Sequence, residues 1–284
     1  MTAVSTDNAT MPLWANLRLP PFSQAALRVV QLASKENLQL HELSELISSD
    51  PALASEVLTI VNSLVYAPRF PIASILQAIA VMGANHLQGL CLMVGVRGYL
   101  GKSLHYPTIR ALWRHNLATA AVAEQLASTG FMDRDIAFTC GLMHDLGRMA
   151  FAVVKPLEYA EMLGRQVGPS ASILEPEREF FGRDHCQLGA QLVRDWRLPE
   201  EFESIVAQHH EERDPAAPWG MVELIQLSCR MADSIGFAAF AGCQCPVFDD
   251  LVAELPTRER KVFHLDMETL AAEVARKIAA IEAL

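Results

Sequence analysis

The sequence predicts an all-α protein, and three observations lead to this fold class. Apolar residues recur at steps of three or four along most of the chain, which is the spacing of one helix face. Several of these stretches begin with the aspartate, serine or proline residues that start helices. No stretch shows the sustained alternation of apolar and polar residues that is typical of a half-buried strand. We therefore expect a multi-helical bundle.

The N-terminal part of the chain is predicted to hold a series of short helices. Asp50 can accept hydrogen bonds from the free N–H groups of a first helical turn, and Pro51 fits the first helical position. Gly83 is expected to end a later helix. The expected helices of this part cover 22–32, 40–47, 51–62, 71–83 and 86–100.

The C-terminal part continues the helical pattern. Pro107 begins a long helix that is expected to reach about Ser128. Asp133, or a neighbour, and Asp184 are expected to cap two of the helices that follow. Further helices are expected over 157–167, 170–181, 184–196, 198–210 and 222–233.

The bulk composition excludes several classes of protein. A net charge of -10 over 284 residues argues against a nucleic-acid-binding surface, which needs a basic stripe. The longest apolar stretch, Gly89–Val96, is too short to cross a bilayer, and the first eight residues lack the basic start and apolar core of a secretion signal. The six cysteines have no regular spacing, which favours buried thiols over disulfides. We expect a cytoplasmic protein that binds neither membrane nor nucleic acid.

Ionisable residues stand on the predicted apolar helix faces, where burial is costly unless they are paired or bind metal. A lone histidine of this kind is usually a hydrogen-bonded core residue. His209 and His210 could lie at the negative end of a helix dipole, and Asp233 could cap a helix or pair with Arg230. A single convergent site explains the whole set with one cause. Its members are His115, His144, Asp145, His185, His209, His210 and Asp233.

The number and type of these residues predict a binuclear metal site. Imidazole and carboxylate ligands suit Fe, Mn, Ni, Co or Zn, and seven ligands exceed what one ion uses. Asp145 is the natural bridge, because it follows His144 directly within an apolar helical run and on the same helix turn. Two close ions can activate a water and hold a phosphoryl oxygen, which is the chemistry of phosphoester hydrolysis. A helical scaffold whose histidines satisfy one another stays open as an alternative.

These residues resemble those of a known family. The order His115, His144-Asp145, Asp233 resembles the HD-domain metal-dependent phosphohydrolases, and the further histidines make the set similar to the binuclear HD-GYP variant. The chain from about 12 to 240 more specifically resembles HDOD, the HD-related output domain of bacterial signalling proteins. The stretches that carry this resemblance are 19–21, 49–53, 61–63, 72–79, 113–116, 141–148, 184–185 and 196–199.

Two departures from the family pattern bear on what the resemblance implies. Arg148 stands where the family has lysine; arginine can hold a phosphate with two hydrogen bonds but neither ligates metal nor gives up a proton. No Gly-Tyr-Pro follows His209-His210, so hydrolysis of cyclic-di-GMP is not favoured. The resemblance implies a signal-transduction output module that binds a signalling protein or a nucleotide. The alternative is an active metal-dependent phosphohydrolase on a nucleotide or other phosphoester, with Asp145 and Arg148 as catalytic residues.

The resemblance also suggests how the chain is divided. We expect a disordered lead at 1–11, an HDOD domain at 12–240 and a C-terminal helical extension at 241–284. Within the domain, an N-terminal helical subdomain at 12–105 would pack on an HD-like subdomain at 106–240, which holds every predicted ligand.

Overall fold

The fold is that of an all-α protein, as predicted. The computed structural model describes residues 19–33, 38–63, 66–130, 132–165, 172–211, 213, 218–240 and 245–283. Within these ranges the regular structure is entirely helical, and no β-strand occurs. The predicted disordered lead, residues 1–11, lies outside the described residues.

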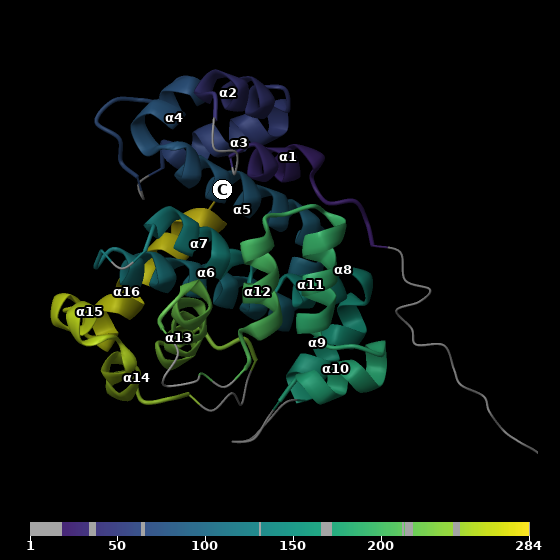
Figure 1. Cartoon of the computed structure of the whole chain (residues 1–284). Coiled ribbons are helices and arrows are strands. Elements are labelled where there is room, and N and C mark those ends of the chain that lie inside the picture. Colours follow the sequence, from purple (N-terminus) through teal and green to yellow (C-terminus); the bar gives the residue numbers. More distant parts are fainter. Residues whose placement is uncertain are drawn as a thin grey trace, which may run out of the picture.

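The N-terminal helices form a group of their own at one end of the molecule (Figure 1). These helices are α1 (Gln24–Ala33), α2 (Leu40–Ser48), α3 (Pro51–Val61), α4 (Ile75–Met82) and α5 (Ala84–Leu100). The start signal before α3 is confirmed, because Asp50 accepts hydrogen bonds from the N–H groups of Ala52 and Leu53. The long helix α5 packs against α1, α3 and α4 on one side and against α7 on the other. It therefore connects the N-terminal group to the rest of the molecule.

The helix α6 (Pro107–Ala127), which follows the short 3-10 helix η2 (Gly101–His105), lies at the centre of the second half (Figure 1). It packs against α7 (Arg134–Met143), α13 (Met221–Ser234) and α16 (Met267–Glu282). Glycine makes the contact with α7 close: a Cβ at Gly141 would lie 2.7 Å from the Cα of Ala120. The residues at the C-terminal end of α7 are thereby held against the middle of α6.

The expectation that His144 and Asp145 lie within one helix is wrong. The helix α7 ends at Met143, and α8 (Leu146–Val154) begins after Asp145, whose φ of -97° and ψ of 28° are not helical. Gly147 supplies the reason, because a Cβ there would lie 2.0 Å from the carbonyl oxygen of His185. The break redirects the chain so that α8 packs directly on α11 (His185–Asp195).

Helices α9 to α12 complete the side of the molecule on which α8 lies (Figure 1). Asp184 begins α11 with a capping box, as the sequence indicates. Two expected boundaries differ: α10 starts at Leu174 rather than at 170, and α12 ends at Gln208. The bounds are α9 (Pro156–Arg165), α10 (Leu174–Phe181) and α12 (Glu200–Gln208).

The C-terminal segment adds α14 (Phe248–Glu254), α15 (Thr257–Val262) and α16, which returns to pack along α6. The expected division of the chain at residues 105 and 240 stays a prediction. None of the described helices combines the length and apolarity that crossing a bilayer requires. The five cysteines within the described ranges are free thiols; three of them are buried as expected, whereas Cys229 is partly buried and Cys245 is exposed.

Candidate metal centre

The seven predicted ligands come together between α6, α7, α8, α11, α12 and α13, and most of them lie at helix ends. The expectation that all seven occupy helix faces is therefore wrong. Helix termini suit polar side chains because the backbone already leaves groups there that need partners. The positions are the middle of α6 for His115, the C-terminal end of α7 for His144, the start of α8 for Asp145, the first residue of α11 for His185, the C-terminal end of α12 for His209 and His210, and α13 for Asp233.

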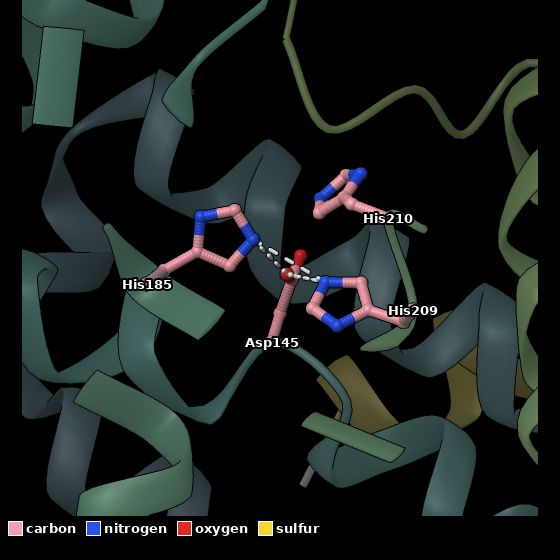
Figure 2. Close-up of side chains that lie close together, drawn as sticks. All are labelled: Asp145, His185, His209 and His210. Carbon is pink, nitrogen blue, oxygen red and sulfur yellow. Dashed lines mark hydrogen bonds and ion pairs between the residues drawn. The ribbon is translucent and has the colours of Figure 1, made fainter. Parts of the chain in front are cut away.

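Asp145 lies at the centre of the first group of potential ligands (Figure 2). Its Oδ1 is 3.2 Å from Nε2 of His209 and 3.5 Å from Nε2 of His185, and these two nitrogens are 3.3 Å apart. His210 belongs to the same group, in which one potential ligand atom from each residue lies within 4.8 Å of the others. The Asp145, His185 and His209 side chains are almost fully buried, whereas His210 is exposed.

The outer nitrogens of the two buried rings are already committed to other partners. Nδ1 of His185 donates to Oε2 of Glu177 at 2.6 Å, and Nδ1 of His209 donates to the carbonyl oxygen of Val206 at 3.0 Å. Both Nε2 atoms therefore point at Asp145 Oδ1. Three acceptor atoms meeting in a buried space repel one another unless a proton or a metal ion lies between them.

Electrostatics favour a cation at this position. Burial lowers the pKa of His185, but the charge of Glu177 together with the contacts of Cys186 outweighs it and raises the pKa to about 10. Burial raises the pKa of Asp145, but the Arg148 guanidinium and the surrounding histidines together outweigh it and hold the pKa well below its usual range. Burial lowers the pKa of His209, so that its Nε2 carries a lone pair. The site thus stabilises a positive charge next to a carboxylate and a neutral imidazole.

A second group of potential ligands lies on the other side of Asp145, made by His115, His144 and Cys229. Nδ1 of His144 donates to the carbonyl oxygen of Gly141 at 2.7 Å, and burial lowers the pKa of His144 to about 3. The lone pair on its Nε2 is fully buried and finds no hydrogen-bond partner among the described residues. This nitrogen is 3.5 Å from Asp145 Oδ2. The two oxygens of Asp145 thus face the two groups separately.

Asp233 contacts the site through His115. Its Oδ1 is 3.2 Å from Nδ1 of His115, which also donates to the carbonyl oxygen of Phe237 at 2.8 Å. Nε2 of His115 lies 3.4 Å from Sγ of Cys229. Burial lowers the pKa of His115, but Cys229 and Asp233 raise it well above its usual range. Each of the two groups thus contains one histidine that favours a positive charge.

Arg148 is buried beside both groups. Its guanidinium is 3.2 Å from Asp145 Oδ2 and donates to Nε2 of His210 at 3.2 Å. The role of Arg148 as a phosphate-holding or catalytic residue stays a prediction. A cavity of about 730 Å³ opens beside Arg148, and its wall includes His115, His209, His210, Cys229, Arg230, Asp233 and Phe240.

Two residues of this centre escaped the sequence reasoning. Glu177, which is fully buried, also accepts hydrogen bonds from the backbone N–H of His185 and from Tyr159, so it positions the His185 ring. A glutamate in an exposed-looking run, eight residues before His185, carries no signal of this role. Cys229 precedes Asp233 by four residues and so shares its helix face, a spacing that could have marked it.

The donor set fits a transition metal. Clustered imidazoles, a shared carboxylate and an unpartnered lone pair on His144 are the features that such ions satisfy. Fold and site together define an all-helical protein with a histidine- and aspartate-rich candidate metal centre. The model of the HDOD domain family matches residues 19–212, and the chain belongs to this family.

The chain is also similar to individual proteins. An uncharacterized protein of Treponema pallidum (strain Nichols) is 27% identical over 198 residues, which are 68% of this chain and 37% of that protein. The chain therefore spans little more than a third of this curated relative. A solved HDOD domain protein with unknown function from Geobacter sulfurreducens has a TM-score of 0.68 at 22% identity, covering 95% of this chain and 93% of that one.

Two further solved structures share the fold. A "Putative signal transduction protein" from Marinobacter aquaeolei VT8 has a TM-score of 0.67 at 23% identity, covering 96% of this chain and 60% of that one. A "Putative metal-dependent phosphohydrolase" from Shewanella amazonensis SB2B has a TM-score of 0.64 at 15% identity, covering 93% of each chain. At these identities the likeness establishes the fold.

Proposed function

We propose that the chain is a bacterial, cytoplasmic HDOD signal-transduction output module with a binuclear metal site, and that it acts by binding a signalling protein or a nucleotide. The observation that carries the metal site is the convergence of the buried Nε2 atoms of His209, His185 and His144 on the two oxygens of Asp145. Partner binding rests on family membership together with the names of its structural relatives.

In this proposal Asp145 bridges the two ions. One ion would be held by Asp145 with His185, His209 and His210, and the other by Asp145 with His115 and His144, beside which Asp233 lies. The ions are of the Fe, Mn, Ni, Co or Zn class, because imidazole and carboxylate ligands suit these. A pair of such ions, when bound, polarises phosphoryl oxygens and lowers the pKa of water.

A phosphorylated small molecule suits the cavity beside the site. A volume of about 730 Å³ is in the range of ligand-binding pockets. The guanidinium of Arg148 on its wall matches phosphate oxygens, and the ring of Phe240, 6.0 Å from that guanidinium, offers an apolar face for a base. The nucleotide branch of the proposal therefore places the phosphate next to Arg148.

Metal analysis tests the proposal directly. The purified protein is reconstituted with Fe or Mn without oxygen, and its bound metal is counted by elemental analysis. We expect two ions per chain in the natural protein and a strong loss of bound metal in His144→Ala and Asp145→Ala. The control variant His41→Ala should keep both ions, since His41 is an exposed residue of α2. A protein that stays free of metal after reconstitution contradicts the proposal.

Phosphoester hydrolysis is the second candidate function, and one observation favours it. The cavity wall holds His115, His209 and His210 together with Arg148, so that a ligand in the cavity reaches the predicted metal ligands. Arg148 would hold a phosphate, and Asp145 would keep the ions in place. Turnover on a panel of nucleotides that is lost in His144→Ala and Asp145→Ala supports the enzyme. Bound metal without turnover on that panel favours the binding module.

A further inference from the structure

We infer that Cys229 is a metal ligand, so that the two halves of the centre differ: a nitrogen–sulfur half at His115 and His144, and a nitrogen–oxygen half at Asp145, His185, His209 and His210. This inference rests on the proposed metal site and adds a ligand outside the predicted set. It implies that the nitrogen–sulfur half takes a thiophilic ion.

The position of Cys229 on α13 brings its thiol to the ligands of α6 and α7. These helices pack against one another. Sγ of Cys229 lies 3.4 Å from Nε2 of His115, and one potential ligand atom each of Cys229, His115 and His144 lies within 4.8 Å of the other two. Three donors at such spacing can close around one ion after small shifts, since zinc-sulfur and zinc-nitrogen bonds are about 2.3 and 2.0 Å long.

A hydrogen bond between the thiol and His115 does not account for this group. Such a bond satisfies Cys229 and His115, but it leaves the buried Nε2 lone pair of His144 without a partner within the described structure. His144 cannot turn this nitrogen away, because its Nδ1 is held by the carbonyl oxygen of Gly141. A cation shared by the three side chains satisfies all of them at once.

The contacts of His115 further support a ligand role for the thiol. Asp233 and the carbonyl oxygen of Phe237 both lie at Nδ1 of His115. A carboxylate or carbonyl on the outer nitrogen is the usual way in which a protein orients a metal-binding histidine. Nε2 is then the coordinating atom, and the side chain beside it is Cys229 rather than Asp233.

A thiolate changes what this half of the centre binds. Soft sulfur ligands select Zn, Fe or Co over Mg, Ca or Mn, and a metal ion removes the proton of a thiol that coordinates it. The other half has only imidazole and carboxylate donors. The two halves should therefore differ in affinity and in the ion they prefer.

Cobalt spectroscopy of the full chain tests the inference without any activity assay. Reconstitution of the natural protein with Co²⁺ alone should produce a sulfur-to-cobalt charge-transfer band in the near ultraviolet, besides the visible bands of cobalt. Cys229→Ser should lose the charge-transfer band and bind one cobalt tightly instead of two. We expect the affinity of the second cobalt to fall by at least about 100-fold, the upper end of the loss caused by removing an orienting partner.

Cys91→Ser is the matched control, because Cys91 is a fully buried thiol of α5 outside the potential ligand groups of the described residues. It should keep the band and both ions. If the natural protein binds cobalt but shows no charge-transfer band, or if Cys229→Ser keeps the band, Cys229 is not a ligand although the proposed metal site stands. If the natural protein binds no cobalt, the proposed metal site fails and this inference fails with it.

Discussion

Replacing Gly147 by alanine probes the contact that positions His185 against Asp145. A Cβ at this position would lie 2.0 Å from the carbonyl oxygen of His185, 2.7 Å from its carbonyl carbon and 2.8 Å from its Cα. The oxygen would have to move by about 1.4 Å to reach an ordinary contact of 3.4 Å. Because this obstacle is backbone, it cannot be relieved by a side-chain rotation, and α8 and α11 must separate.

The cost of this separation can be bounded. Overpacking of a well-packed interior costs ~1–3 kcal/mol, and a backbone obstacle belongs at the upper end of that range. Gly98→Ala is the matched control, because Gly98 is an exposed helical residue of α5 with nothing described within 4 Å of the added Cβ. Alanine at a helix-interior position is more stable than glycine by ~0.5–1 kcal/mol. The two variants should therefore change stability in opposite directions.

Denaturant unfolding of the two variants, followed by circular dichroism, measures the difference. We expect Gly147→Ala to lose ~3 kcal/mol or to accumulate poorly, and Gly98→Ala to gain slightly. Metal content should fall in Gly147→Ala as well, since His185 moves away from Asp145. A Gly147→Ala protein with natural stability would refute the account of the helix break given above.

Three other perturbations follow from the same contacts. Glu177→Gln removes the carboxylate on the outer nitrogen of His185, so metal affinity measured by competition with a chelator should fall ~10–100-fold; an unchanged affinity would exclude the orienting role. Asp184→Ala removes the capping box of α11 and should lower the free energy of unfolding by ~0.5–2 kcal/mol, whereas Asp184→Asn, which keeps an acceptor, should lose less. Burial raises the pKa of Glu124, but Lys277 and Arg134 together outweigh it and lower the pKa below its usual range. The stabilisation by Glu124 is thus present above the ordinary carboxyl pKa and is lost as the pH falls through the lowered pKa of the folded protein. Glu124→Gln should therefore lower the free energy of unfolding more at pH 7 than at acid pH. An equal loss at both pH values would contradict the pairing.

Local sequence signals predicted most helices, because the interactions that start a helix lie within a few residues of one another. Asp50, Asp133 and Asp184 cap the helices that follow them, and the capping hydrogen bonds come from N–H groups two or three residues ahead. Such caps depend on the chain nearby and not on distant contacts. The same locality explains why the all-α class could be read from the periodicity of apolar residues.

The break between α7 and α8 could not be read in this way. The residues around His144 are apolar and helix-compatible, so local preference favours a continuous helix. The continuous helix is interrupted where α11 approaches Gly147 closely. This contact joins segments that are almost 40 positions apart in the chain. The prediction that His209 and His210 lie on a helix face was wrong for a related reason, because α12 ends just before these two residues.

The sequence by itself determined the helical class and the family resemblance, and it singled out seven residues of the candidate site, since buried histidines and aspartates need partners wherever they lie. Only the tertiary structure decided which atoms face one another. It showed that Asp145 turns one oxygen to each ligand group, that Glu177 holds His185 and that Cys229 adjoins His115. These facts depend on helix packing and ring orientation, which are set by contacts between distant segments and leave no periodic trace in the chain.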